Sequence, residues 1–227
     1  VRDYGEEKTK YILEGFYKER ATTIRINGNA TTKEELIREL TGEGIQVKEH
    51  PLLASALLIS GYDYLAAIPA FREGKFQVQD AASIMVAEQA GIKEGDYILD
   101  VCAAPGGKAT ELGAKLNGEG LLLANDISNS RAKALLKNLE LMGIPNIYVT
   151  SETSEKLAKI LPEFFDKILV DAPCSGEGMF RKNEQACEEW SPENVKICAA
   201  RQQEILACAA SMLRPGGRMV YSTCTFA

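Results

Sequence analysis

The sequence predicts an α/β protein, in which a small N-terminal α+β module precedes a doubly wound, mostly parallel sheet. From about Gly91 onward, short apolar runs alternate with helix-forming segments, which is the pattern of parallel strands joined by helices. Before that point the elements are short and mixed, and 227 residues suffice for a medium domain beside a small one. We therefore expect the module over residues 1–73 and the larger domain over residues 74–227.

The small module is expected to contain both helices and strands. We expect a helix over Glu6–Tyr17, and the alternating β-branched run Thr22–Asn27 favours a strand. The segment Thr32–Leu40 starts with a residue suited to helix capping and continues with two glutamates, as a helix N-terminus should. Further strands are expected over Ile45–Lys48 and Ala56–Ile59, with turns at Gly61 and Pro69.

The larger domain divides into five expected strands and the helices that join them. The strands are expected over Tyr97–Cys102, Leu121–Asp126, Ile147–Thr150, Lys167–Asp171 and Met219–Cys224. The helices are expected over residues 108–116, Ser130–Met142, Glu155–Leu161 and Pro192–Leu213. Pro192 suits the first turn of the last helix, and the sequence Arg214–Gly217 is expected to end it.

The composition is that of an ordinary soluble globular protein. Hydrophobic residues make up 45% and charged residues 26%, which excludes a disordered chain, a collagen-like chain and a simple heptad rod. The longest nearly apolar stretch, Leu52–Ile59, is less than half a bilayer span, and no leader opens the chain. We therefore expect neither export nor membrane insertion.

The six cysteines argue against a disulfide scaffold and against a metal site. They form no CxxC pair and do not cluster with the single histidine, His50, which we expect to be incidental. Free thiols are typical of a reducing cytoplasm, the location we expect. The cysteines expected to be structural are Cys102, in the first strand of the larger domain, and Cys187, Cys198 and Cys208.

The charge balance bears on a nucleic-acid partner. The chain has 26 basic and 32 acidic residues, a net charge of −6. Acidic residues are in excess both before and after Ala90. Affinity for a polyanion therefore needs a local basic groove or a further domain, because bulk charge does not supply it.

Several functional groups follow expected strands of the larger domain directly. They are Ala103–Lys108 after the first strand, Asp126 after the second, Asp171–Gly178 after the fourth and Cys224 after the fifth. In doubly wound folds, ligands bind beyond the carboxyl ends of the strands. The sequence therefore predicts one site built from these four groups.

The glycine-containing turn Ala103–Lys108 suits a ligand that approaches the backbone closely. The helix that follows offers free N–H groups to an anionic group, and Asp126 is placed to accept hydrogen bonds from ribose hydroxyls. A tight turn with a helix cap is the simpler interpretation of the same residues. The turn matches neither the dinucleotide fingerprint nor the phosphate loop.

The sequence Asp171-Ala-Pro-Cys174 places a carboxylate and a thiol around a rigid Ala-Pro pair. A buried apolar thiol is the usual interpretation of a single cysteine, but the flanking acid and the glycines at 176 and 178 favour an open site. Cys224 ends a neighbouring strand. Two thiols without a CxxC partner indicate nucleophilic rather than redox chemistry.

Three ordered motifs carry a resemblance to a known family. They are Leu99–Lys108 (LDVCAAPGGK), Asp171–Gly176 (DAPCSG) and Ser222–Cys224 (STC). Together they resemble the RNA (cytosine-5) methyltransferases of the NOP2/Sun family. The segments Gly176–Lys182 and Trp190–Glu193 resemble its bacterial ribosomal small-subunit methyltransferase F branch, and Thr23–Asn27 resembles the strand that opens the family's N-terminal module.

The resemblance implies a Rossmann-like domain that binds S-adenosylmethionine. By the family pattern, the turn that holds the methionine end of the cofactor consists of Ala103, Ala104, Pro105, Gly106, Gly107 and Lys108. Asp126 would contact the ribose hydroxyls, Arg131 would lie near that rim, and Asp171 would border the cofactor. Residues Gln79–Ser83 would line the same pocket.

The resemblance also implies the chemistry. Carbon 5 of cytosine is a poor nucleophile, so a thiolate first adds to carbon 6 and pushes electrons toward carbon 5. By the family pattern Cys224 is the attacking thiol, Cys174 assists release, and Asp171 hydrogen-bonds the cytosine. The base must leave its stack to reach such a pocket. RNA, and ribosomal RNA in particular, is the expected partner.

Two features depart from the family pattern. Thr153 occupies the place of the acid that contacts adenine, with Glu152 beside it as a candidate. The chain stops at Ala227, three residues after the fifth strand, so we expect a domain truncated at its C-terminal end and without the RNA-binding extension of this branch. Arg181 and Lys182 are candidates for contacts to RNA phosphate.

Two alternatives remain open. One is a methyltransferase for an amine or a small molecule, which needs Asp171 but neither thiol. The other is a non-catalytic RNA-binding module that keeps the fold as a scaffold. Turnover that does not depend on cysteine would favour the first alternative. Cofactor binding without a covalent RNA intermediate would favour the second.

Overall fold

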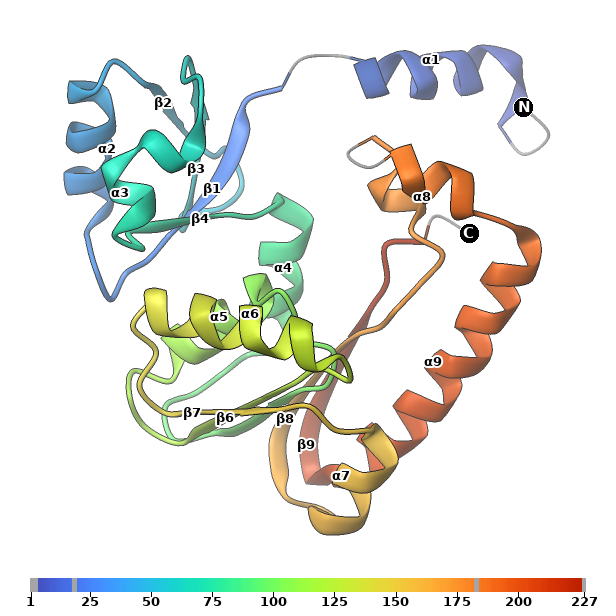
Figure 1. Ribbon diagram of the computed structural model, residues 1–227. Helices are drawn as coiled ribbons and strands as arrows, with labels where there is room; N and C mark the ends of the chain where they lie inside the picture. The colour runs from blue at the N-terminus through green and yellow to red at the C-terminus, as the bar shows by residue number, and fades with distance from the viewer. Residues whose placement is uncertain (1–3, 18–19, 182–183, 226–227) are drawn as a thin grey trace.

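The computed structural model describes residues 4–17, 20–181 and 184–225 and contains two sheets (Figure 1). The first sheet has the strand order β2-β3-β1-β4, and its neighbouring strands are antiparallel. These strands are β1 (Thr22–Ile26), β2 (Gln46–Glu49), β3 (Ala56–Ser60) and β4 (Phe76–Val78). The helices before β4 are α1 (Gly5–Tyr17), α2 (Lys33–Gly42) and α3 (Pro69–Arg72), with the 3-10 turn η1 (Leu65–Ala67). Strand β4 lies beyond residue 73 and pairs with β1.

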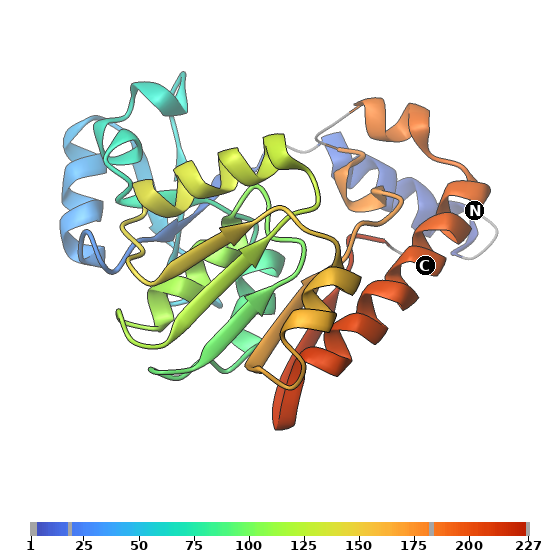
Figure 2. The same ribbon diagram turned by 60° about the horizontal axis from the view of Figure 1, so that its bottom comes forward.

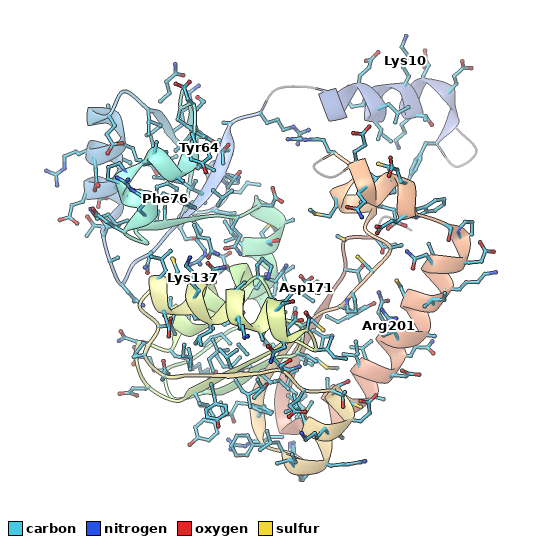
Figure 3. The ribbon with its side chains drawn as sticks, in the orientation of Figure 1. Lys10, Tyr64, Phe76, Lys137, Asp171 and Arg201 are labelled. Carbon is cyan, nitrogen blue, oxygen red and sulfur yellow. The ribbon has the colours of Figure 1, made fainter. Side chains whose placement is uncertain are left out.

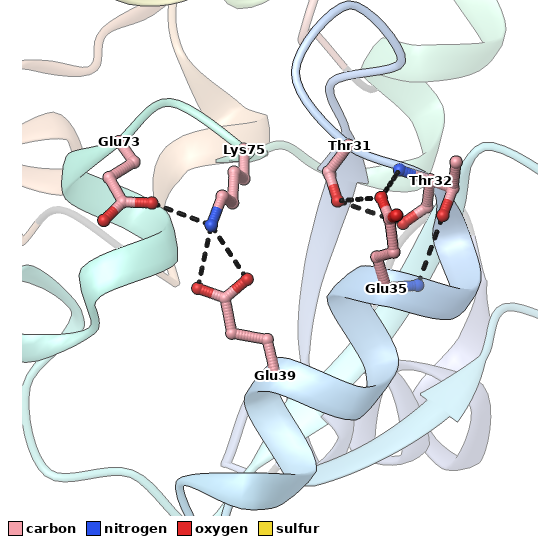
Figure 4. A network of polar contacts seen from close by, with 6 residues as sticks. All are labelled: Thr31, Thr32, Glu35, Glu39, Glu73 and Lys75. Carbon is pink, nitrogen blue, oxygen red and sulfur yellow. Dashed lines mark hydrogen bonds and ion pairs between the residues drawn. The ribbon is translucent and has the colours of Figure 1, made fainter.

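Helix α2 begins as its sequence predicts. The hydroxyl of Thr32 accepts the N–H of Glu35 at 3.3 Å, and the Glu35 carboxylate accepts the N–H of Thr32 at 3.2 Å (Figure 4). This reciprocal capping satisfies two backbone donors at the start of the helix. Glu39 on the same helix binds the ammonium of Lys75 at 2.9 Å, so α2 is joined to the chain just before β4.

The second sheet has the order β7-β6-β5-β8-β9, and all of its neighbouring strands are parallel (Figure 2). The strands are β5 (Tyr97–Asp100), β6 (Leu121–Asn125), β7 (Ile147–Thr150), β8 (Phe165–Asp171) and β9 (Leu213–Ser222). The chain steps outward from β5 to β7 and then returns to β8 on the other side of β5. The carboxyl ends of β5 and β8 therefore flank the crevice in which ligands of such sheets bind.

Helices cover both faces of this sheet, so the doubly wound α/β architecture is confirmed. The helices are α4 (Ala81–Gln89), α5 (Gly107–Lys115), α6 (Asn129–Leu141), α7 (Ser154–Ile160), α8 (Glu184–Glu189) and α9 (Pro192–Met212), with the 3-10 turn η2 (Glu177–Met179). One core cluster joins the sheet to α4, α5 and α6, and a second joins its other face to α7 and α9. Figure 1 shows these two layers on opposite sides of the sheet.

The structure differs from the sequence-based expectation in several places. Strand β5 ends at Asp100 instead of Cys102, and β4, α4 and α8 were not expected. Pro69 does not form a turn but occupies the first position of α3, where its fixed φ is suited to a helix. Strand β9 starts at Leu213 instead of Met219, and it ends at Ser222. The segment that stops α9 therefore belongs to the strand, where a register irregularity opposite Phe165 accommodates it, and Cys224 lies in the loop beyond.

None of the helices within residues 4–17, 20–181 and 184–225 is long and apolar enough to cross a membrane. The same part of the chain holds no group of three or more His, Cys, Asp or Glu side chains suited to a metal ion.

Candidate functional site

A cavity of about 260 Å³ lies at the carboxyl edge of the parallel sheet, between the ends of β5 and β8. Its lining residues are Val78, Gln79, Asp80, Ser83, Asp100, Cys102, Ala103, Ala104, Pro105, Gly107, Lys108, Asp171 and Met179. Five of the six residues of the predicted turn line this cavity, and Gly106 does not. Figure 3 labels Asp171 at the same edge, on the side of the sheet that faces α8. The cavity thus lies where the sequence analysis expects a site, although Cys174 and Cys224 are not among its lining residues.

Side chains of α6 hold the turn before α5 by its carbonyl groups. Arg131 donates to the carbonyl of Ala104 at 3.1 Å, and Asn138 donates to the carbonyl of Pro105 at 2.7 Å. Gly106 precedes the helix with φ +113, and a Cβ there would lie 3.1 Å from the Leu135 side chain. Glycine is required at this position because an L side chain rarely adopts that conformation.

Asp126 directly follows β6 and is almost completely buried. One of its oxygens pairs with Arg131 at 3.1 Å, and the other accepts the N–H of Ser128 at 3.0 Å. Neither Asp126 nor Arg131 is among the residues that line the cavity. Because Arg131 also binds Ala104, the pair lies at the rim of the turn.

The carboxylate of Asp171 is held by two side chains from neighbouring elements. Lys108 of α5 pairs with it at 2.6 Å, and the hydroxyl of Ser222 at the end of β9 donates to it at 2.7 Å. Charge-assisted hydrogen bonds of this kind are among the stronger ones in proteins. The structure thus joins the predicted cofactor turn to the predicted catalytic acid.

The two predicted thiols meet, with the Sγ atoms of Cys174 and Cys224 separated by 2.7 Å. The hydrogen bond from Cys224 lowers the pKa of Cys174 to about 6, and backbone N–H groups assist. The same contact, with burial, raises the pKa of Cys224. The pair therefore gives up one proton readily and the second with difficulty, so one thiolate is present at neutral pH.

The loop that carries Cys224 lies against Gly178. The N–H of Gly178 donates to the carbonyl of Cys224 at 2.7 Å, and a Cβ on this glycine would lie 2.8 Å from the same oxygen. Nearby, Glu177 accepts hydrogen bonds from Ser175 and from the indole of Trp190. These contacts hold the two thiol-bearing loops together.

Asp100 is a site residue that sequence analysis did not single out. It is the last residue of β5, is 1% exposed and lines the cavity, yet among the described residues neither carboxylate oxygen has a hydrogen-bond partner beyond a weak interaction with the backbone N–H of Cys102. Burial, with the negative charge of Asp171 next in size, raises the pKa of Asp100 to about 7. A buried polar group with so little compensation is costly, which makes Asp100 a candidate for contact with a ligand. The sequence signal that could have identified Asp100 is its place at the end of a strand, just before the turn.

Other expected residues have different surroundings. The hydroxyl of Thr153 caps α7 by accepting the N–H of Lys156, and the Glu152 carboxylate pairs with the Lys156 ammonium at 2.6 Å. Neither residue lines the 260 Å³ cavity. Cys102 does line it, but burial raises the pKa of its thiol to about 12, so Cys102 is not a nucleophile. Lys182 lies outside the described residues.

A second cavity, of about 680 Å³, lies between the small module, α1 and the loop after β8. It shares Val78 and Asp80 with the first cavity, and it also contains Gly178, which contacts Cys224. Basic side chains border it, among them Arg20 and Arg181. His50, which we expected to be incidental, also lines this cavity.

Comparisons with known proteins agree with the fold and with the motifs. The family model for the 16S rRNA methyltransferase RsmB/F matches residues 88–227, and that for the RsmF/B-like ferredoxin-like domain matches residues 1–62. The chain is 46% identical over 154 residues to ribosomal RNA small subunit methyltransferase F of Escherichia fergusonii, and 46% identical over 155 residues to that of Escherichia coli O7:K1. Each match covers 67% of this chain and 32% of the relative, so the chain spans about a third of their length.

Solved structures show the same fold. The crystal structure of PH0851 has a TM-score of 0.92 at 31% identity and covers 97% of this chain and 50% of that one. A methyltransferase homologue from Pyrococcus horikoshii has a TM-score of 0.84 at 28% identity, and covers 97% and 70%. Because one family model matches more than half of the residues, the chain belongs to the RsmB/F family of 16S rRNA methyltransferases, within the NOP2/Sun family.

Proposed function

We propose that this chain carries the catalytic centre of an enzyme that transfers a methyl group from S-adenosylmethionine to carbon 5 of a cytosine in ribosomal RNA. The observation that carries the proposal is the contact of Cys174 with Cys224, at 2.7 Å. Neither thiol lines the cavity of the glycine turn, but Asp171, three residues before Cys174, does. The names of the two small-subunit methyltransferase F relatives support ribosomal RNA as the substrate. Such a substrate assigns the activity to the cytoplasm.

The residues around the 260 Å³ cavity fit S-adenosylmethionine, which supplies an electrophilic methyl group when bound. The buried carboxylate of Asp100 can accept hydrogen bonds from the ammonium of the methionine end. The turn 103–108 lies beside it, and Asp126 at the rim can accept hydrogen bonds from the ribose. The archaeal NSun6 structure with SFG, at 23% identity, shares the fold.

The thiol pair suits a mechanism with a covalent adduct. The proton between the two sulfurs can reside on either, so Cys224 becomes the nucleophile when Cys174 takes the proton. The Cys224 thiolate would then add to carbon 6, and carbon 5 would take the methyl group, with S-adenosylhomocysteine as the leaving group. Cys174, once it has passed its proton to solvent, would accept the carbon 5 proton as the carbon–sulfur bond breaks and Cys224 leaves as the thiolate.

Asp171 is the residue we assign to the cytosine. Lys108 and Ser222 hold its carboxylate in a fixed orientation at the edge of the cavity. One oxygen can accept a hydrogen bond from the cytosine amino group, which orients the ring for the addition. The 680 Å³ cavity, with Arg20 and Arg181 at its border, is the path proposed for the RNA strand and the unstacked base.

The test uses the product of the whole gene, 16S rRNA and S-adenosylmethionine with a labelled methyl group. We expect label in the RNA, 5-methylcytosine on bisulfite sequencing, and loss of both in Cys224→Ala. Label at another atom that survives removal of both thiols would overturn the cytosine-5 chemistry and favour the other acceptor class. Cofactor binding without any transfer would favour a scaffold.

A further inference from the structure

Arg25 of β1 is a buried cation that extends from the small module into the larger domain. It is 3% exposed, and its Nη2 donates to the hydroxyl of Thr110 on α5 at 2.8 Å. Its Nε donates to the side-chain carbonyl of Gln79 at 2.8 Å and lies 3.8 Å from the carboxylate of Glu111. A residue of the first sheet thus contacts the helix that follows the cofactor turn.

The contacts of Arg25 continue to the turn itself. The Thr110 hydroxyl lies 2.6 Å from the side-chain carbonyl of Gln77 and 3.0 Å from the carbonyl of Gly107, so its single proton is shared between these two acceptors. The N–H of Thr110 donates to the carbonyl of Gly106 at 2.8 Å. Gln79 lies against Gly107, where a Cβ would be 3.9 Å from its amide carbon, and it lines the 260 Å³ cavity. Gln77 also accepts from Nη2 of Arg25 at 3.1 Å. Two of the partners of Arg25, Thr110 and Gln79, therefore contact the backbone or the wall of the cofactor site.

The buried charges of Arg25 and Glu111 make this cluster sensitive to substitution of its residues. Burial lowers the pKa of Arg25, and the charge of Glu111 opposes that effect. Burial raises the pKa of Glu111 to about 7, while Arg25 and Lys115 lower it and Glu88 raises it. Buried charges persist only when they are paired with good geometry, and the planar guanidinium provides that geometry where an ammonium does not.

Asn27, the residue that follows β1, provides a contrast. It is also buried, and its amide donates to the carbonyls of Gly74 and Met142, so it too joins the small module to the larger domain. Its partners are neither in the turn nor among the residues that line the 260 Å³ cavity. Docking of the module and control of the turn are therefore assigned to different residues, Asn27 and Arg25.

We propose that Arg25 is a positioning residue for the methyl donor, which holds the turn 103–108 through Thr110 and the cavity wall through Gln79. The identity of the donor rests on the proposed function, whereas the effect on the turn does not. The small module is then part of the cofactor site and not only an appendage that binds RNA.

The test compares Arg25→Lys and Thr110→Val with Thr110→Ser, which keeps the hydroxyl, and with Asn27→Ala. Calorimetric titration with S-adenosylmethionine measures the Kd, and hydrogen exchange measures the protection of amides 103–108. We expect Arg25→Lys and Thr110→Val to weaken binding about tenfold and to reduce protection of the turn, because each removes a hydrogen bond in the cluster. Thr110→Ser is expected to keep the cofactor affinity and the amide protection of the unmodified protein. Asn27→Ala is expected to lower Tm without changing the affinity or the protection.

The outcomes separate this inference from the proposed function. If the unmodified protein binds the cofactor and Thr110→Val binds it equally well with full protection of the turn, the role of Arg25 is refuted. An Asn27→Ala variant that weakens binding as much as Arg25→Lys would refute it too, because any loosening of the module would then suffice. If the unmodified protein binds no cofactor, the proposed function fails, and the exchange of amides 103–108 still decides whether Arg25 holds the turn.

Discussion

The sulfur atoms of Cys174 and Cys224 lie 2.7 Å apart, although 50 residues separate them in the chain. Cys174 follows β8 and Cys224 follows β9, and these strands pair in parallel as far as Asp171 and Ser222. Parallel strands end at the same edge of a sheet, so two short loops bring the thiols together. Gly178 allows this close approach because it has no Cβ to collide with the Cys224 carbonyl.

The thiol pair predicts unusual reactivity at low pH. Because the hydrogen bond from Cys224 lowers the pKa of Cys174 to about 6, its alkylation by iodoacetamide should be half-maximal near that pH and fall below it. In Cys224→Ala the hydrogen bond is lost, and the midpoint should move toward the ordinary thiol value of about 8.5. Mass spectrometry of the modified peptide over a pH series measures both midpoints. Equal midpoints in the two proteins would contradict the coupling.

Asp126→Ala is expected to weaken the binding of S-adenosylmethionine by about 1.5–3 kcal/mol, because charge-assisted hydrogen bonds to the ribose are lost. The fold should persist, since Asp126 lies just after a strand end. Asp166→Ala is the matched control, since Asp166 also pairs with an arginine, Arg214 at 2.9 Å, but lies at the start of β8, away from the carboxyl edge of the sheet. Calorimetric titration that finds the same affinity for Asp126→Ala and the unmodified protein would remove Asp126 from the ribose role.

The edge of the sheet at which the candidate site lies could be predicted, because it depends on the order of strands and turns along the chain. Strand ends and a turn of fixed sequence are visible in the chain, and they place Lys108, Asp171 and Cys174 at one edge once the sheet is parallel. In the structure Lys108 pairs with Asp171 at 2.6 Å, and Cys174 contacts Cys224 beyond the ends of β8 and β9. The roles assigned to these side chains stay predictions.

Other features were not predictable because they arise from tertiary contacts. Arg25 and Thr110 are 85 residues apart, and no local pattern indicates that the two domains share a buried polar cluster. Asp100 resembles any acid at a strand end until the structure shows how little the described residues compensate the burial of its two oxygens. Strand β9 begins at Leu213 because pairing with β8 outweighs the weak strand preference of Pro215 and its neighbouring glycines.

Asp100→Asn is expected to stabilise the free protein while weakening cofactor binding. The folded-state pKa of Asp100 is about 7, above the ordinary value of about 3.9. The folded state therefore holds a proton that the unfolded state has lost, and the free energy of unfolding falls as the pH rises between these two values. The asparagine side chain does not titrate, so the variant lacks this pH dependence of the free energy of unfolding. We expect a higher Tm at about pH 8 and at least tenfold weaker binding of S-adenosylmethionine.

Thermal unfolding and calorimetric titration of the two proteins test this expectation. Ser55→Ala is a suitable control, since it removes another buried side-chain oxygen without a partner, outside the cavity. If Asp100→Asn unfolds at a lower temperature at all pH values and binds the cofactor unchanged, Asp100 is a structural residue only.

The last prediction distinguishes the roles of the two thiols. If Cys224 adds to carbon 6, Cys224→Ala abolishes both methyl transfer and the covalent RNA complex. If Cys174 assists only the release, the Cys174→Ala protein still forms the covalent adduct and methylates the base, but it does not release the RNA. The reason is that the nucleophile acts before the methyl group moves and the releasing group acts after it. The product of the whole gene with Cys174→Ala, mixed with RNA and S-adenosylmethionine, should then give a slowly migrating band on a denaturing gel.

Removing both thiols controls for non-specific crosslinks, and that variant should give no band. The 2.7 Å contact makes the reverse assignment a real competitor, since either sulfur can hold the shared proton. Should Cys224→Ala accumulate the adduct while Cys174→Ala does not, Cys174 is the nucleophile and its lowered pKa prepares it for attack. Should neither form an adduct while methyl transfer persists, the thiols serve no covalent step, and an acceptor that does not require cysteine accounts for the activity.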